Sequence, residues 1–312
     1  MHRKYKIYDI DRKAEWEELF ANAHFTHMTQ SWNFGEAKRA SKWRPRRIVI
    51  KQDGQPVAIC QVLYKMIAGI PVAARINQGP VMLTGHAEKD VDVLIAIRNH
   101  WRYLLHGLLL IAPAATYSDK SLEALKAMGF RLRNHNRWTS SRVDLMQSEE
   151  EMRKKLNSKW RNQLNKSEHQ GLQFVVCDSP FYIEWILQRH IDNMKEKDFD
   201  GPSSELLLAL YKESPADFNI FKVVREGNAV ASVVAYKFGD IAHYYIGNYS
   251  SEGRRLNAGN FILWNTALEL KRLGCTHFDL GGHSNNSSSG FSGFKLGMNG
   301  QKYELVGEFW SL

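Results

Sequence analysis

The sequence contains an internal repeat, in which a segment of the first half recurs in altered form 173 positions later. Residues 46–58 read RRIVIKQDGQPVA, and residues 219–231 read NIFKVVREGNAVA. Each copy has two apolar runs separated by an acidic residue and a glycine, a pattern typical of a β-hairpin. The helices and strands predicted after each hairpin also follow the same order, so the repeat indicates duplication of a whole α/β unit. We therefore expect two similar domains, residues 1–145 and 146–312, with a ligand-binding cleft between them.

Length and composition agree with two folded domains. The chain has 312 residues, of which 44% are hydrophobic and 24% are charged, and these proportions exclude a disordered or fibrous protein. No apolar run is long enough to cross a bilayer, and the charged N-terminus is unlike a signal peptide. The three cysteines are far apart in sequence, which favours a reducing compartment over a disulfide framework. These features predict a cytoplasmic protein without a transmembrane segment.

Positive charge is concentrated in the first half. Residues 1–145 have 23 Lys and Arg against 13 Asp and Glu, a net charge of +10, whereas residues 146–312 have 19 against 20, a net charge of −1. Such an excess favours phosphate-bearing partners: RNA, nucleotides, or an anionic membrane surface touched peripherally. A solvated basic face would give the same counts, and the counts alone leave both interpretations open.

Hydrophobic periodicity predicts a mixed α/β chain. Helices are expected at residues 13–23, 34–41, 88–105, 119–128, 149–169, 180–194, 204–213 and 260–273. Strands are expected at residues 46–51, 57–65, 108–114, 130–133, 142–145, 172–177, 219–225, 229–238, 241–249 and 276–280, and near Arg75. The strand at residues 276–280 is followed by Gly281-Gly282 and a polar loop. α/β proteins often have their reactive groups at such a strand end.

This order of elements is similar to the acyl-CoA N-acyltransferase fold. Acyl-CoA enzymes of that fold bind the pyrophosphate at a helix N-terminus through Arg/Gln-x-x-Gly-x-Gly/Ala. The corresponding segment here reads RRLNAG over residues 254–259, with Asn257 in place of the first glycine. The substitution weakens acyl-CoA as the acyl donor without excluding it.

Three sequence blocks resemble the Fem family, the aminoacyltransferases that build peptidoglycan cross-bridges from aminoacyl-tRNA. The blocks are Gln30-Ser31-Trp32-x-Phe34-Gly35-x-x-Lys38, then Lys159-Trp160-Arg161 with Lys166 and Gly171, then Asp279-Leu280-Gly281-Gly282 with Phe294-Lys295-x-Gly297. The family fold is a tandem pair of acetyltransferase-like domains, in agreement with the repeat. The long coiled-coil arm of some members is absent. The arginine that the family usually has is also missing from the stretch 194–197, so the identity of the acceptor substrate stays open.

The resemblance implies a reaction in which an acceptor amine attacks the ester carbonyl of an aminoacyl-tRNA. Lys295 would stabilise the oxyanion, and Phe294 would hold the terminal adenine or shape the pocket. Asp279 is either a general base or the cap of the loop that follows it, and Lys295 could alternatively be a surface residue. Lys38 would contact the phosphates of a nucleotide-linked acceptor. The other candidate substrate-binding residues are Trp32, Phe34, Arg161, Lys197, Tyr249 and His283.

The partners implied in this way are aminoacyl-tRNA and a peptidoglycan precursor or related peptide, with no further cofactor. His24 and His27 could share a helix face, but no third ligand is near in sequence, and no metal site is predicted. Two other functions stay open. One is a CoA-dependent N-acyltransferase acting on an amino sugar or peptide in cell-surface polysaccharide synthesis, and the other is a non-catalytic module that binds RNA or another anion.

Overall fold

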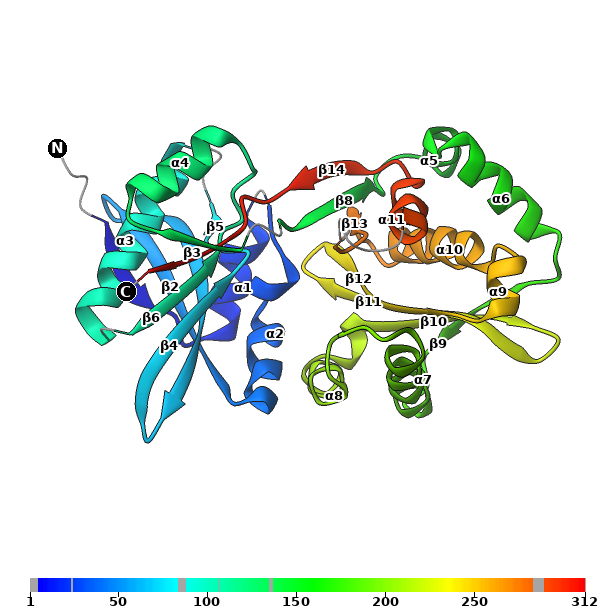
Figure 1. Cartoon of the computed structure of the whole chain (residues 1–312), viewed down its shortest axis with the longest axis horizontal. Coiled ribbons are helices and arrows are strands. Elements are labelled where there is room, and N and C mark those ends of the chain that lie inside the picture. The colour runs from blue at the N-terminus through cyan, green and yellow to red at the C-terminus, as the bar shows by residue number, and fades with distance from the viewer. Residues whose placement is uncertain are drawn as a thin grey trace. The chain divides into compact units, whose positions relative to one another are not determined.

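The computed structural model describes residues 5–23, 25–83, 88–105, 107–134, 137–282 and 289–311. His24 and His283 lie outside the described residues. The chain is a mixed α/β protein with two compact units (Figure 1). The first unit comprises Met1–Trp138 and Glu304–Leu312, and the second comprises Thr139–Tyr303. The expected fold class is confirmed, and each unit is built around its own twisted sheet.

The first sheet has the strand order β1-β2-β3-β4-β6-β15-β7, with the short β5 paired to β3. Its strands are β1 (Lys6–Asp9), β2 (Trp43–Gln52), β3 (Gln55–Ile67), β4 (Ile70–Asn77), β5 (Val81–Met82), β6 (Leu108–Ala112), β7 (Arg131–Asn134) and β15 (Glu308–Ser311). Helices α3 (Glu88–Leu105) and α4 (Asp119–Ala127) cover one face, and α1 (Lys13–Ala21) and α2 (Trp32–Ala37) cover the other (Figure 1). A core of aliphatic strand residues packed on Val93, Ile97 and Leu125 holds α3 and α4 to the sheet.

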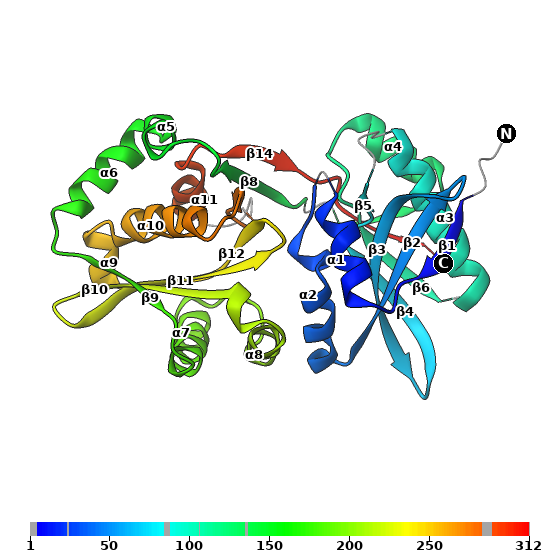
Figure 2. The same ribbon diagram turned by 180° about the vertical axis from the view of Figure 1, so that it is seen from behind.

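The second sheet has the order β9-β10-β11-β12-β13-β8-β14. Its strands are β8 (Thr139–Asp144), β9 (Gln173–Cys177), β10 (Phe218–Arg225), β11 (Asn228–Phe238), β12 (Ile241–Tyr249), β13 (His277–Asp279) and β14 (Gln301–Glu304). One face is covered by α6 (Ser158–Glu168) and α10 (Ala258–Arg272), and the other by α7 (Phe181–Lys197) and α8 (Ser204–Glu213), as Figure 2 shows. The remaining helices are α5 (Glu149–Lys155), α9 (Ser251–Arg255) and α11 (Ser289–Leu296).

The internal repeat is preserved down to the pairing of individual residues. In the first hairpin Ile50 pairs with Ala58 and a bulge follows before Lys51, and in the second Val223 pairs with Ala231 with a bulge at the same place. Both turns use an acidic residue and a glycine with positive φ, the backbone that a tight two-residue turn requires. A bulge at the same offset of 173 makes independent origin of the two hairpins a poor explanation, because bulges are specific local features.

The units exchange one strand each. β8 follows β7 of the first unit in sequence but pairs with β13 of the second sheet. β15 follows β14 of the second sheet but pairs with β6 and β7 of the first. The chain therefore divides at Trp138/Thr139 and returns at Glu304, which differs from the predicted boundary at 145/146. The sequence order alone placed β8 in the first domain, because the sheet that a strand joins depends on long-range pairing, which the sequence does not show.

Two predicted elements also need correction. The single helix expected over residues 149–169 is two helices, α5 and α6, because Leu156 leaves helical geometry and the Asn157 side chain caps a new helix by accepting from the Lys159 N–H. The helix expected over 34–41 is α2 followed by a 3₁₀ turn, Lys38–Ser41. None of the described helices combines the length and apolar composition needed to span a bilayer.

Candidate active site

Three adjacent strands of the second sheet place ionisable side chains in one row. His243 of β12 lies opposite Asp279 of β13, and Asp279 lies opposite Arg142 of β8. Asp279 is 1% exposed and Arg142 is 7% exposed, so water screens neither charge. An unpaired charge in such a place would be strongly unfavourable, and the row therefore depends on mutual pairing.

Asp279 is the central acceptor of this row. Its Oδ1 accepts hydrogen bonds from Ser140 Oγ at 2.7 Å and from the Gly281 backbone N–H at 2.9 Å. Its Oδ2 accepts from Arg142 Nε at 3.1 Å and from the Tyr303 hydroxyl at 2.6 Å. Such a set of donors stabilises the ionised carboxylate and fixes its orientation.

The electrostatics of Asp279 follow from this geometry. Burial by itself would raise the pKa of Asp279, but His243, Arg142 and Ser140 hold it well below its usual value. His243 Nδ1 lies 3.5 Å from Asp279 Oδ1. A carboxylate that binds protons so weakly is a poor general base. The sequence left two roles open for Asp279, general base and cap of the following loop. The hydrogen bonds favour the cap.

Gly281 makes the cap feasible. Its φ of +70° is a conformation that L-residues rarely adopt. A Cβ at this position would lie 2.8 Å from the Tyr244 carbonyl oxygen. Glycine is required here because the chain must turn sharply beside β12 to direct its N–H at Asp279.

Lys295 is buried close to this row. It lies on α11 and is 3% exposed, so the alternative of a surface lysine is wrong. Its Nζ sits 4.1 Å from the centre of the Tyr244 ring, a cation–π distance. Burial lowers the pKa of Lys295 to about 7, and the charge of Asp279 opposes part of that fall. A lysine with this pKa changes its protonation state near neutrality, as a group involved in acyl transfer chemistry would.

Aromatic rings form a wall beside Lys295. The Phe294 ring is stacked on Trp160 with centroids 6.3 Å apart and meets Tyr249 edge-on at 5.9 Å. The hydroxyl oxygens of Tyr249 and Tyr244 are 3.1 Å apart. Burial raises the pKa of Tyr249 to about 12, so its hydroxyl stays protonated. The structure thus brings the predicted Lys295, Asp279, Phe294 and Tyr249 into one region.

The N-terminus of α10 borders the same region. Asn257 takes the left-handed conformation, with φ of 54°, that the replaced glycine would have supplied, and asparagine tolerates it better than most residues. A Cβ on Gly259 would meet the Phe294 ring at 3.2 Å and the Tyr249 ring at 3.4 Å. The turn is therefore retained, while two aromatic rings pack against the first turn of the helix.

Comparisons with known proteins agree with this architecture. Residues 152–295 match the family described as "Acetyltransferase (GNAT) domain". The structure of FemX covers 98% of this chain and 96% of its own, with a TM-score of 0.80 at 14% identity. This chain has a Fem-like tandem acetyltransferase fold. A search of curated proteins found no significant match.

Other solved structures resemble this chain at lower similarity. One is the tandem GNAT protein from the clavulanic acid biosynthesis pathway, with a TM-score of 0.58, 11% identity and coverage of 99% of this chain and 98% of that one. Another is the C-terminal domain of a putative lysylphosphatidylglycerol synthetase from Agrobacterium fabrum, with a TM-score of 0.55, 14% identity and coverage of 96% and 92%.

In the first unit, the Gln-Ser block positions α2. The buried side chain of Gln30 donates to the Asn77 carbonyl at 2.8 Å and accepts from the Gln61 N–H at 2.8 Å, which links the segment to β3 and β4. Ser31 caps α2 by accepting from the Phe34 N–H. The Phe34 ring is itself buried, with the Lys38 Nζ 6.0 Å away. We infer that Phe34 packs the helix and supports Lys38.

Lys38 lies in a positive environment. Its pKa is lowered by burial first and then by the charges of Arg75 and Lys65. Lys65 donates to the Ser41 carbonyl at 3.1 Å, and Arg75 pairs with Glu308 at 2.8 Å. A half-buried lysine beside two like charges is a suitable place for an anionic group.

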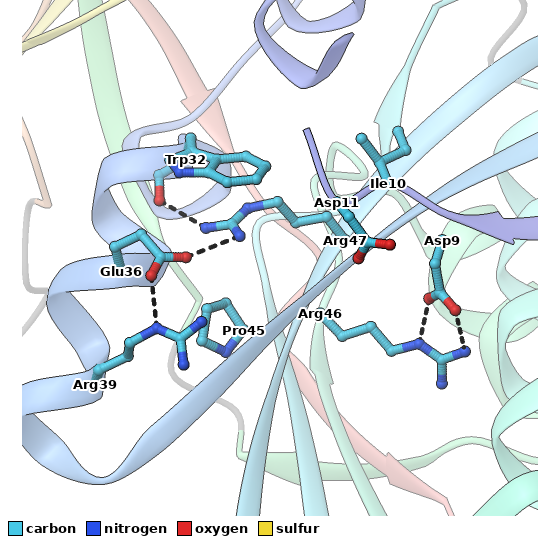
Figure 3. A pocket seen from close by; sticks show the side chains of 9 residues that line it. All are labelled: Asp9, Ile10, Asp11, Trp32, Glu36, Arg39, Pro45, Arg46 and Arg47. Carbon is cyan, nitrogen blue, oxygen red and sulfur yellow. Dashed lines mark hydrogen bonds and ion pairs between the residues drawn. The ribbon is translucent and has the colours of Figure 1, made fainter. Parts of the chain in front are cut away.

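A separate pocket of about 530 Å³ lies on the other side of α2 (Figure 3). Figure 3 shows that Trp32, Glu36 and Arg39 face it, whereas Phe34 and Lys38 are not among its lining residues. The Arg47 guanidinium is stacked 3.5 Å from the Trp32 ring and pairs with Glu36 at 2.9 Å. One face of Trp32 is therefore already covered.

The last two sequence candidates lie in the second unit. Arg161 Nη1 donates to the Lys154 carbonyl at 3.2 Å and so joins the two short helices. Lys197 donates to the Asn193 side chain, and its pKa is lowered by burial and by the nearby Arg254. Among the described residues, no His, Cys, Asp and Glu side chains are grouped as a metal site requires.

Sequence reasoning missed four polar partners of Asp279 in the site. They are Ser140, Arg142, His243 and Tyr303. Only one signal was available, namely polar residues interrupting otherwise apolar strands. The partners are 24 to 139 residues from Asp279 in sequence, so no local motif connects them.

Proposed function

We propose that this protein is an acyltransferase, and specifically an aminoacyltransferase that moves an aminoacyl group from aminoacyl-tRNA to an amine of a peptidoglycan precursor or related peptide. The observation that carries the proposal is Lys295, buried beside an ionised Asp279 and tuned to a pKa of about 7. Burying an amine in this way opposes stability, so a chemical role is the better explanation.

The proposed step follows from the chemistry of an ester. The acceptor nitrogen attacks the ester carbonyl carbon, a C–N bond forms, and the bond from carbon to the ribose oxygen breaks. The ribose oxygen takes up the proton that the amine loses. The charged form of Lys295 would donate a hydrogen bond to the oxyanion that develops in between, and Asp279 would hold the surrounding loop.

The first unit supports a phosphate-bearing acceptor. Lys38, Lys65 and Arg75 form a positive cluster, in which the pKa of Lys38 is already lowered. A phosphate bound there would offset the repulsion that Arg75 and Lys65 exert on Lys38. The half-buried setting would also strengthen its attraction to Lys38, because nearby charges are less screened than in water.

Two features support tRNA over CoA as the carrier. The rings of Phe294 and Tyr249 pack against Gly259 at the start of α10, which reduces the room for a pyrophosphate there. The first half of the chain also has a net charge of +10, which favours a polyanionic substrate. Aminoacyl-tRNA is a cytoplasmic metabolite, so we expect the protein to act in the cytoplasm.

Transfer of labelled amino acids tests the proposal. The full chain would be incubated with charged total tRNA and a nucleotide-linked peptidoglycan precursor, with and without RNase. We expect RNase-sensitive label in the precursor, lost in Lys295→Ala and kept in Lys302→Ala. Lys302 is a suitable control because it is an exposed lysine in the same unit. Equal activity of Lys295→Ala and the wild type would refute the role of Lys295.

A CoA-dependent N-acyltransferase is a second candidate function. It is favoured by the match of residues 152–295 to an acetyltransferase domain, and by Asn257, which keeps the turn of the phosphate-binding loop. The same assay with labelled acetyl-CoA distinguishes the two. Label transferred from acetyl-CoA to an amino sugar or peptide, with none from tRNA, would establish the second function instead.

A further inference from the structure

The hairpin of β3 and β4 extends beyond the rest of the first sheet (Figures 1 and 2). The last pair joining β2 to β3 is Trp43 with Lys65, and the pairing of β4 with β6 begins at Ala73. Between those points only Met66 with Pro71 and Ile67 with Ile70 are paired. The tip is therefore a two-stranded ribbon without neighbours, an arrangement that is only marginally stable in water.

This unsupported tip is apolar and exposed. Ile67 is 64% exposed, Ile70 is 66% exposed and Val72 is 38% exposed. The corresponding hairpin of the second unit, between β11 and β12, ends in Phe238 and Ile241, which are only 5% and 6% exposed. Phe238 is 173 positions after Lys65, so the second hairpin ends where the first continues, and the exposed isoleucines of the first have no counterpart there.

The segment around the tip is strongly basic. Residues 37–87 contain a single acidic residue, Asp53, against nine basic residues, Lys38, Arg39, Lys42, Arg44, Arg46, Arg47, Lys51, Lys65 and Arg75. Lys42 and Arg44 are exposed and lie next to Trp43, at the base of the projecting ribbon. An apolar projection with cations at its base matches the layers of an anionic bilayer, apolar inside and negative at the surface.

We propose that the β3–β4 hairpin docks this protein on an anionic lipid bilayer, with Ile67 and Ile70 entering the acyl region and Lys42 and Arg44 contacting the headgroups. An apolar insertion and a basic patch together supply the two signals that stable peripheral attachment needs. RNA fits the tip less well, because isoleucine offers neither a ring for stacking nor a hydrogen bond to a base. A second copy of this chain also fits poorly, because two such basic segments would repel each other.

Vesicle co-sedimentation of the full chain tests the proposal. We expect binding to vesicles of phosphatidylglycerol and phosphatidylcholine and little binding to phosphatidylcholine alone. Ile67→Ser/Ile70→Ser should lower the partition coefficient at least tenfold. Lys42→Gln and Arg44→Gln should each lower it about fivefold, since a basic residue near an anionic surface contributes about 1 kcal/mol. Val176→Ser removes another exposed apolar residue, 45% exposed on β9, and should have no effect.

Depth of insertion gives an independent readout. The three native cysteines are buried, so Ile67→Cys can be labelled selectively with an environment-sensitive fluorophore. We expect a blue shift on adding anionic vesicles, and no shift for a label at Asn228→Cys on the β10–β11 hairpin. Failure of the wild type to bind either vesicle, or equal binding of the isoleucine variant, would overturn the proposal. Loss of tRNA binding or of self-association in that variant, with vesicle binding unchanged, would assign the tip to RNA or to a second copy instead.

Discussion

The two units share one strand pattern but fill it with opposite chemistry. In the first sheet, Ile76, Ile111 and Phe309 form a row across β4, β6 and β15, and each is at most 1% exposed. In the second sheet, the row across β12, β13 and β8 is His243, Asp279 and Arg142. The rows are one register position apart in the repeat, because Leu63 pairs with Arg75 and Tyr236, 173 positions later, pairs with His243. They therefore contrast an apolar row with an ionisable row and are not equivalent positions.

The difference separates stability from function. A buried aliphatic side chain contributes about 1.5–3 kcal/mol through burial. A buried ion pair gains little over apolar residues of the same size, because both ions lose their hydration. The second unit thus has a less favourable interior than the first, which the catalytic role proposed for the neighbouring Lys295 would explain. The predictions below test this contrast between the two rows.

Removal of the central carboxylate should have the largest effect. Asp279→Ala removes the carboxylate that pairs with the buried Arg142 guanidinium and accepts from the Ser140 and Tyr303 hydroxyls, and we expect the free energy of unfolding to fall by about 3–5 kcal/mol. Ile111→Val in the apolar row should cost about 1 kcal/mol. Chemical denaturation of both variants measures the difference, and similar losses would remove the contrast between the rows.

Replacement of Lys295 should separate activity from stability. Lys295→Met removes the proposed oxyanion donor, so we expect kcat to fall by about 100- to 1000-fold. The free energy of unfolding should rise by about 2 kcal/mol or more, because the folded protein no longer holds a buried amine with a displaced pKa. Lys302→Met should change neither quantity. A variant that loses stability together with activity would indicate a structural role for the amine.

The stability gain should depend on pH. Lys295 has a pKa of about 7 when folded, below its unfolded value of about 10.4, so the unfolded chain holds the extra proton between these values. The free energy of unfolding of the wild type should therefore rise with pH by up to about 1.4 kcal/mol per pH unit over this range. Denaturation at pH 7, 8 and 9 should show the advantage of Lys295→Met shrinking, and a constant advantage would contradict the lowered pKa. Activity that needs the charged amine should fall above pH 7.

The smallest effect is expected in the first unit. Lys38→Ala should raise the KM for a phosphate-bearing acceptor about tenfold and leave kcat nearly unchanged, because Lys38 would bind substrate away from the reacting atoms. Lys42→Ala, which removes an exposed lysine nearby, is the matched control. A fall in kcat without a change in KM would show that Lys38 takes part in the reaction step. The first unit would then not be limited to substrate binding.

Sequence reasoning succeeded where local patterns suffice. The helix over Glu88–Leu105, the strand over Ile241–Tyr249 and both repeat hairpins were predicted from periodicity and turn residues. It did not foresee the break near Asn157, which depends on one capping side chain, the pairing of the predicted strand β8 with the second sheet, or the strand β15. Lys295 and Asp279 were singled out from the sequence, but their burial and their partners were not foreseen.

The sequence by itself determined the duplication, the α/β class and the candidate pair Asp279 and Lys295, because repeats, periodicity and strand ends are local features of the chain. Only the tertiary structure decided what surrounds that pair. Arg142 and Ser140 reach Asp279 from a strand about 140 residues earlier, and burial then shifts the pKa of Lys295 to about 7. Desolvation and pairing depend on the packing of the whole unit, so no segment of sequence contains them.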